Sequence, residues 1–225
     1  MRLILASASP RRAELLHAAR YEFEIAAVAV DESHEPGETP ARYVRRLAAA
    51  KSAAAARIVG TAKAAPHVET REQTPRDTSA YVGHRFSGAE PPIVLGADTV
   101  VVVDSTILGK PTDDADAARM LHLLSAKHHQ VLTGVSVRQG AHEIGRVETT
   151  TVQFAQLTND EIAWYVASGE GRDKAGAYAI QGLASRFIPR IEGSYSNVVG
   201  LPIACVRELI TEISNTRQGR SSPNR

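Results

Sequence analysis

Short apolar runs alternate along the chain with stretches whose apolar residues recur every three or four positions. The first pattern predicts buried strands and the second predicts amphipathic helices. Strands are predicted at residues 3–6, 22–30, 93–95, 100–103 (after an interruption at 96–99), 130–138 and 143–154, with a hairpin-like stretch at 186–191. Helices are predicted at residues 10–19, 39–59, 112–124, 158–169 and 202–213. This alternation, with antiparallel pieces in the second half, predicts an α/β fold with a mixed central sheet.

Capping residues support these helix starts. Ser9 and Thr39 each precede a proline, which suits a capped first turn. Thr158 and Glu161 have the spacing of a capping box before a short helix that ends at Gly169. We therefore expect one domain over residues 1–215, with a mobile surface insertion at about 62–92, where no period is sustained, and a disordered polar tail at 216–225.

Composition narrows the class of protein. The chain has 225 residues, enough for a sizeable core, and 43% of them are hydrophobic. A formal net charge of +1 gives no reason to expect nucleic-acid or membrane-surface partners. No apolar run approaches the ~20 residues that span a bilayer, and residues 1–12 do not have a signal peptide's pattern. The single cysteine, Cys205, reads as a core residue in a reducing compartment, so a cytoplasmic location is expected.

The segment DKAGAYAIQG, residues 173–182, concentrates varied chemistry. Asp173, Lys174, Tyr178 and Gln181 supply an anion, a cation, an aromatic face and an amide, between glycines that let a backbone approach a ligand. The alternative is a glycine-rich turn with an exposed ion pair.

A second group, SASPRR at residues 7–12, lies at a predicted strand-to-helix junction. A helix N-terminus offers free N–H groups and a positive dipole end to an anion. Arg11 and Arg12 oppose that dipole but could grip phosphate oxygens, with Ser7 and Ser9 beside them. The alternative is a capped helix with solvated arginines.

Single charged residues on apolar surfaces add to this picture. Lys51 shares the apolar stripe of its helix, so it must reach solvent, a carboxylate or a cleft. Asp98 interrupts the apolar run IVLGADTVVVV and, as predicted at a strand end, needs a partner or a metal, unless it only caps a local turn. Glu32 offers a second carboxylate to a hard cation such as Mg²⁺, and Lys110 offers another ammonium to phosphate.

Together these residues indicate a nucleotide phosphoanhydride site: carboxylates for a metal and water, cations for phosphates, and the Tyr178/Gln181 loop for a base or ribose. The chain has no G-x-x-x-x-G-K-[ST], H-E-x-x-H or G-x-S-x-G motif. Its eight histidines show no ligand spacing. The adjacent His128 and His129 should point to opposite faces of a strand and read as surface or strand-end groups.

Five motifs in order, SASPRR, LGADTVV, LGKP, DKAGAYAIQG and GSYSNVVGLP, resemble those of the Maf family of nucleoside triphosphate pyrophosphatases. They extend from residue 7 to residue 202. The resemblance implies a fold like that of the inosine-triphosphate pyrophosphatases, with two lobes around a cleft. It also implies hydrolysis of a nucleoside triphosphate to the monophosphate and pyrophosphate with Mg²⁺ or Mn²⁺, usually by a homodimer.

The resemblance also assigns roles. It implies that Asp98 is the proton acceptor and, with Glu32, holds the metal. The phosphate and metal site would further include Ser9, Arg11, Lys51, Lys110, Asp173 and Lys174, and Ser7 is expected to bind substrate with them. Arg12, Thr99 and Gln181 match the branch of the family that favours dTTP and UTP.

Two departures and two alternatives stay open at this point. Gly171 stands where the family often has proline, and the insertion at 62–92 is longer than expected. A nucleotidyltransferase could use the same groups to pass a nucleotide to another acceptor. A non-catalytic nucleotide-binding regulator of cell division would bind without turnover.

Overall fold

The computed structural model describes residues 1–62 and 90–218. A mixed seven-stranded sheet forms its centre, in the order β2-β1-β3-β5-β6-β7 with β4 paired to β3. Its strands are β1 (Leu3–Leu5), β2 (Phe23–Ile25), β3 (Ile93–Val103), β4 (Thr106–Leu108), β5 (His128–Gln139), β6 (His142–Gln153) and β7 (Arg190–Glu192). β1 is parallel to β2 and β3, whereas the pairs of β3 with β4 and β5 and of β6 with β5 and β7 are antiparallel. The predicted α/β fold with a mixed sheet is confirmed.

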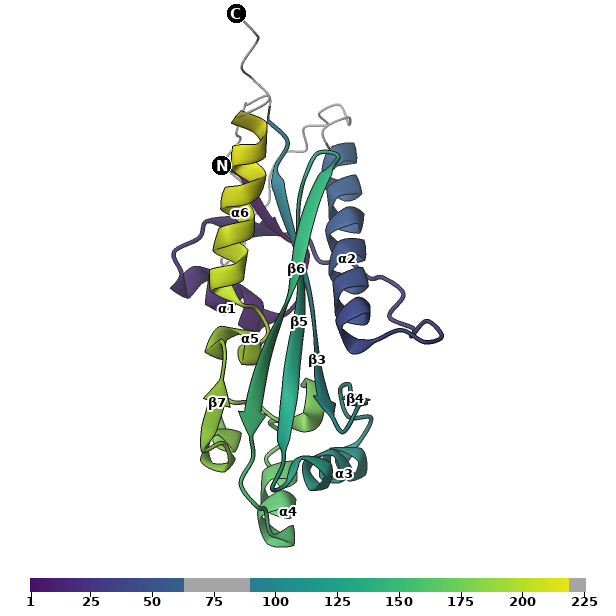
Figure 1. Cartoon of the computed structure of the whole chain (residues 1–225), viewed down its shortest axis with the longest axis vertical. Helices are drawn as coiled ribbons and strands as arrows, with labels where there is room; N and C mark the ends of the chain where they lie inside the picture. The colour runs from purple at the N-terminus through teal and green to yellow at the C-terminus, as the bar shows by residue number, and fades with distance from the viewer. Residues whose placement is uncertain (63–89, 219–225) are drawn as a thin grey trace, which may run out of the picture.

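Helices flank this sheet. They are α1 (Pro10–Ala18), α2 (Pro40–Ala62), α3 (Asp114–Leu124), α4 (Asn159–Ala167), α5 (Tyr195–Val199) and α6 (Ile203–Gln218), with 3₁₀ turns at Ala175–Ala177 and Leu183–Phe187. The long strands β3, β5 and β6 run along the molecule between α2 and α6, and α3, α4 and β7 lie towards one end (Figure 1). One core packs α6 and α1 against the sheet, and another joins α3, α4 and the 3₁₀ turns to the other end.

β3 positions the residues that matter most below. It pairs with β1 only at Ile93, Val94 and Leu95, and with β4 only from Val101 to Val103. Its other edge pairs with β5 from Ile93 to Val102. The predicted interruption at residues 96–99 is therefore wrong, because the ladder to β5 carries the strand straight through it. What is interrupted is the opposite edge, which has no strand neighbour between β1 and β4 among the described residues.

Other local predictions differ from the structure. The strand expected at 22–30 is only Phe23–Ile25, because β1 beside it has just three residues. The hairpin-like stretch at 186–191 is instead a 3₁₀ turn followed by β7, which pairs with the distant β6. β4 and α5 were not predicted, because each is too short for a period to show. The capping box at Thr158 and Glu161 is confirmed.

The two long helices extend beyond their predicted C-terminal ends. α2 runs to Ala62 and α6 to Gln218, so residues 216–218 are helical and not part of a tail. Residues 63–89 of the expected insertion and 219–225 of the expected tail lie outside the described residues. Cys205 is buried as predicted, and burial raises the pKa of its thiol to about 11. Among the described helices, none combines the length and the apolar character needed to traverse a bilayer.

Candidate functional site

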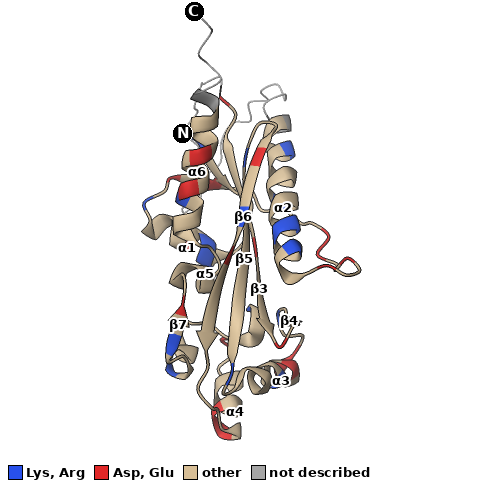
Figure 2. Ribbon diagram, in the orientation of Figure 1, with Lys and Arg blue, Asp and Glu red and all other residues tan. Residues whose placement is uncertain are grey.

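A pocket of about 630 Å³ opens where the predicted motifs converge. Its lining includes all twelve predicted site residues: Ser7, Ser9, Arg11, Arg12, Glu32, Lys51, Asp98, Thr99, Lys110, Asp173, Lys174 and Gln181. Five of these are basic and three are acidic, and the ribbon shows charges of both signs near α1 and β3 (Figure 2). A pocket of this size and cationic excess fits a polyanionic small molecule.

Asp98 lies in the unpaired edge of β3, just beyond the carboxyl end of β1. The prediction that it ends a strand is wrong, since β3 continues past it, but the neighbouring strand β1 does end there. Its residue is 8% exposed, and its Oδ1 accepts a hydrogen bond from Lys51 Nζ at 2.6 Å. Burial raises the pKa of the Asp98 carboxyl, and the Lys51 ammonium offsets that only in part. A carboxylate of this kind is a better proton acceptor than an exposed aspartate.

Lys51 joins two carboxylates. Besides Asp98 it contacts Glu32 Oε1 at 2.8 Å, and its side chain is 12% exposed. Of the three outcomes expected for a lysine on an apolar face, it meets carboxylates inside a cleft. We call Glu32, Lys51 and Asp98 the carboxylate–lysine cluster.

Glycines of the sheet let α2 deliver Lys51 to this point. A Cβ at Gly96 would overlap the Ala48 carbonyl, and one at Gly134 would overlap the Val44 carbonyl. Gly134 is also the residue that pairs with Asp98 across the β3–β5 ladder. The backbone of α2 therefore rests directly on the backbone of the sheet next to the acid.

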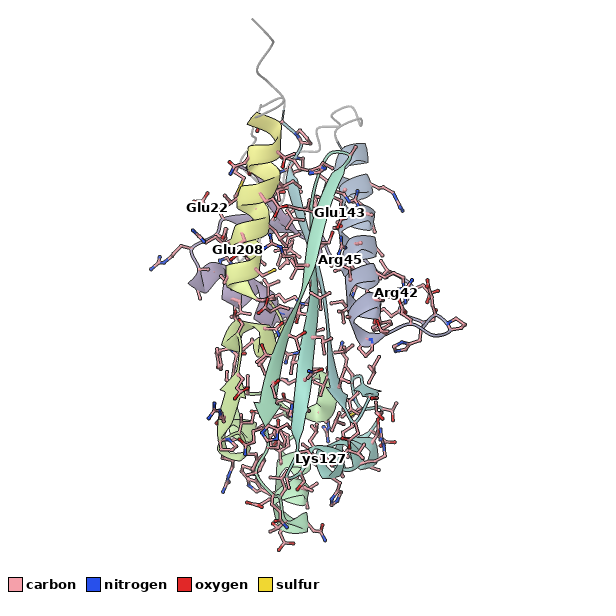
Figure 3. All side chains as sticks on the ribbon, viewed as in Figure 1. Glu22, Arg42, Arg45, Lys127, Glu143 and Glu208 are labelled. Atoms are coloured by element: carbon pink, nitrogen blue, oxygen red, sulfur yellow. The ribbon has the colours of Figure 1, made fainter. Side chains whose placement is uncertain are left out.

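A polar network holds the same helix to β6. Arg45 Nη2 on α2 donates to both carboxylate oxygens of Glu143, at 2.8 and 3.0 Å, and the two side chains lie between helix and sheet (Figure 3). Glu143 also accepts from Ser136, whose hydroxyl pairs with that of Ser52. These contacts fix how far α2 can rotate or slide on the sheet.

Arg12 joins several segments of the pocket. Its Nη1 donates to Ser7 Oγ and to the Ala97 carbonyl, its Nη2 to Thr99 Oγ1, and its Nε to the Gly200 carbonyl, at 2.9–3.1 Å. Burial lowers the pKa of this guanidinium, although arginine stays charged. Most of its donors are therefore engaged with the protein itself.

The start of α1 differs from its prediction. The Ser9 hydroxyl makes no capping hydrogen bond, so the predicted side-chain cap is wrong. Instead Ser7 Oγ accepts from the Ser9 backbone N–H at 3.2 Å. The first turn of α1 is left without a side-chain cap at the wall of the pocket.

The segment 173–182 forms the opposite wall. Lys174 Nζ contacts Asp173 Oδ1 at 2.5 Å and the Glu170 carbonyl at 2.7 Å, while Arg11 lies 3.7 Å from Asp173. The hydrogen bond from Lys174 lowers the pKa of Asp173. Lys110 and Gln181 are exposed and make no hydrogen bond to any residue in the described part of the chain.

The chain matches the family model described as Maf-like protein over residues 2–213. The chain belongs to the Maf family. Among curated relatives, the dTTP/UTP pyrophosphatase of Koribacter versatilis is 45% identical over 210 residues, which cover 93% of each chain. Those of Photobacterium profundum and Vibrio cholerae are 46% and 45% identical, over 90% of this chain and 92% of theirs.

Two aromatic residues of this Maf fold have partners that the sequence did not show. Tyr178, expected to present a face to a base or ribose, lines the pocket but is only 6% exposed, and its hydroxyl lies 2.8 Å from His129 Nε2. His129, expected at a surface or strand end, is buried against Tyr178 and Phe154. Burial lowers the pKa of His129 to about 4. Strand alternation predicted only that His128 and His129 would point to opposite faces, and the fold shows what His129 meets.

Sequence reasoning missed Glu170 altogether. Its carboxylate accepts hydrogen bonds from the Tyr165 hydroxyl and from the backbone at Leu183. The available signal was its position three residues before Asp173, next to the segment 173–182.

The acids of the pocket suit a metal held jointly with substrate. Among residues 1–62 and 90–218, no group of three His, Cys, Asp or Glu side chains could hold a metal ion by itself. Asp98 and Glu32, however, are close enough to share one ammonium, and both line the pocket. Mg²⁺ is commonly bound by one or two carboxylates plus substrate phosphates, so these two residues fit it.

Proposed function

We propose that this chain hydrolyses dTTP and UTP to the nucleoside monophosphate and pyrophosphate. The observation that carries the proposal is the buried Asp98 carboxylate, paired with Lys51 at 2.6 Å in a cationic pocket of nucleotide size. Curated relatives that match over nine-tenths of their length bear the name dTTP/UTP pyrophosphatase. Their name and the Arg12, Thr99 and Gln181 set support the pyrimidine preference.

Cations around the rim bind the triphosphate. Arg11, Lys110 and Lys174 lie on different segments that face one pocket, so they can contact successive phosphates. The uncapped first turn of α1, with Ser7 and Ser9, adds backbone N–H donors for the same anion. Asp173 orients Lys174 and Arg11 from the side.

Asp98 acts as the proton acceptor. One of its oxygens is bound to Lys51, which leaves the other free to take a proton from a water molecule. The oxygen of that water bonds to the α-phosphorus, the bond to the bridging oxygen breaks, and pyrophosphate leaves with the electron pair. Lys51 then faces a neutral carboxyl and can turn towards the departing phosphates.

Asp98 and Glu32 would hold the Mg²⁺ or Mn²⁺ ion. When bound, such an ion neutralises phosphate charge and lowers the pKa of coordinated water. Lys51 keeps the two carboxylates in position for it.

Gln181 contacts the base most directly in this proposal. It is exposed to the pocket with its amide uncommitted among the described residues, whereas Arg12 and Thr99 are bonded to each other. Arg12 and Thr99 therefore form a fixed part of the pocket surface, and the Gln181 amide can adjust its hydrogen bonds to the base.

The test is release of monophosphate and pyrophosphate from a panel of nucleoside triphosphates, with Mg²⁺, with Mn²⁺ and with EDTA. We expect metal-dependent release led by dTTP or UTP. Release led by a purine nucleotide would overturn the base preference, and binding without release would favour the regulator of cell division. Nucleotide adducts formed with an added acceptor would favour a transferase. The expected homodimer, the cytoplasmic location and the lack of a nucleic-acid partner stay predictions.

A further inference from the structure

We infer that Tyr165 and Glu170 form a clamp that sets base selectivity by holding the turn that carries Gln181. Neither residue lines the pocket, so both act through that turn and are positioning residues. The inference rests on the proposed function, because it assumes that the base contacts Gln181. We call residues 179–184 the selectivity loop.

Both ends of the selectivity loop are tied to one hydroxyl–carboxylate pair. The Ala179 N–H donates to Tyr165 Oη at 3.1 Å, and Tyr165 Oη donates to Glu170 Oε2 at 2.7 Å. On the far side, the Leu183 N–H donates to Glu170 Oε1 at 2.9 Å. The loop between them is a turn closed by the Gly182 N–H on the Ala179 carbonyl, with Gln181 at its corner.

Tyr165, which anchors this clamp, is held rigidly by the core. Tyr165 is 1% exposed and packs edge-on against Phe187 in the core that includes α3 and α4. Burial and the hydrogen bond to Glu170 raise the pKa of its hydroxyl, so it remains a donor at any physiological pH. A buried hydroxyl in a packed ring position has little freedom to release its partners.

The glycine after Gln181 shows how closely the carboxylate approaches the loop. A Cβ at Gly182 would overlap Glu170 Oε1. The absence of a side chain at Gly182 is thus what allows Glu170 to reach the Leu183 N–H. Glu170 also accepts from Lys174 Nζ through its own carbonyl, so the same residue positions a phosphate-binding cation.

The experiment compares kcat and KM for UTP and ATP, which differ only in the base, in wild type, Tyr165→Phe and Glu170→Gln. Tyr165→Phe keeps the packed ring and removes the hydroxyl that accepts from the Ala179 N–H and donates to Glu170. We expect the ratio of kcat/KM for UTP over ATP to fall about tenfold, the effect of losing one buried hydrogen bond, mainly through KM. Tyr195→Phe is the matched control, because that tyrosine is 48% exposed and its hydroxyl bonds to no described residue.

A double-mutant cycle separates positioning from general damage. If the clamp acts through Gln181, Tyr165→Phe should not lower the UTP/ATP ratio further in a Gln181→Ala background. Equal loss in both backgrounds, or an unchanged ratio in Tyr165→Phe and Glu170→Gln, would overturn the inference. Thermal melts identify any variant that does not fold. If Tyr165→Phe does not fold, the same comparison is made with Glu170→Gln. Absence of turnover by the wild type would instead overturn the proposed function.

Discussion

The carboxylate–lysine cluster and the selectivity loop face the same pocket but are held in different ways. The cluster is fixed by regular structure: Asp98 by a strand ladder, and Lys51 by a helix whose backbone touches the sheet at glycines. The loop belongs to no long element and is fixed by side chains that bond to its backbone. If the proposed roles hold, the reacting groups lie on the rigid frame, while selectivity depends on a segment that a few substitutions can reshape.

The two regions also differ in charge. The cluster concentrates two acids on one buried ammonium, so its geometry is tied to its electrostatics. The selectivity loop is held by one internal carboxylate, Glu170, and presents an amide to the pocket. Damage to the cluster should therefore appear in kcat, and damage to the loop in the choice of base.

The largest effect should come from Asp98→Asn. It removes the proposed proton acceptor while keeping the shape, so kcat for UTP should fall about 10³-fold with little change in KM. The melting temperature should not fall, because burial already disfavours the charge that is removed. Steady-state kinetics and a thermal melt measure both.

Asp160→Asn, on an exposed position of α4, is the matched control and should leave kcat unchanged. An Asp98→Asn variant with more than a tenth of wild-type kcat would assign the proton transfer to another group.

The next effect is on stability at low pH and concerns His129, which lies beneath the segment leading to the selectivity loop. Its pKa is about 4 in the folded chain, against about 6.5 when unfolded, so the unfolded chain binds more protons between these values. Neutral His129 therefore makes its full contribution to the free energy of unfolding above pH 6.5. As the pH drops towards 4, that free energy falls by roughly 3 kcal/mol, at about 1.4 kcal/mol per pKa unit. Denaturant unfolding at pH 7 and pH 4 measures the change.

Between pH 7 and pH 4 the free energy of unfolding of His129→Gln should fall by about 3 kcal/mol less than that of the wild type, because glutamine does not titrate. His122→Gln, on an exposed turn of α3, should behave as wild type. Identical pH dependence in wild type and His129→Gln would mean that water reaches the imidazole.

A methyl group at Gly134 should separate α2 from the sheet. The added Cβ overlaps the Val44 carbonyl, so we expect Gly134→Ala to lose about 2 kcal/mol of unfolding free energy and to lower kcat by moving Lys51 from Asp98. Gly60 lies on α2 itself, and a methyl group there enters open space. Gly60→Ala should therefore be stabilising by up to ~1 kcal/mol. If both substitutions left kcat and stability alike, the close approach would not position Lys51.

The smallest effect should come from a surface ion pair next to segment 173–182. Arg172 bonds to both oxygens of Asp114, but the side chains are 63% and 51% exposed. Asp114→Asn should therefore change neither stability nor the UTP/ATP ratio measurably. A tenfold shift in that ratio would show that α3 also restrains the selectivity loop.

Much of the fold could be predicted from the sequence, and twelve of the residues that line the pocket could be named, because apolar periods define elements and five motifs converge. Contacts that depend on register could not be predicted. Asp98 was placed at a strand end, since nothing local shows that β5 carries β3 onward. Ser9 was assigned to a side-chain cap, yet the structure has only a bond from the Ser9 N–H to Ser7, and nothing local shows that the Tyr178 hydroxyl meets His129. Glu170 was not predicted, because its carboxylate bonds to the Tyr165 hydroxyl and to a backbone N–H thirteen residues away, and no local pattern shows either contact.

The glycine contacts under α2 have a consequence for how this enzyme family can vary. The spacing between Lys51 and Asp98 is set where backbone touches backbone at Gly96 and Gly134, without any core side chain between them. Substitutions that drift through the surrounding apolar core can alter heat resistance and leave the turnover number unchanged. Two positions that contribute no side chain at all should therefore be among those least tolerant of genetic change.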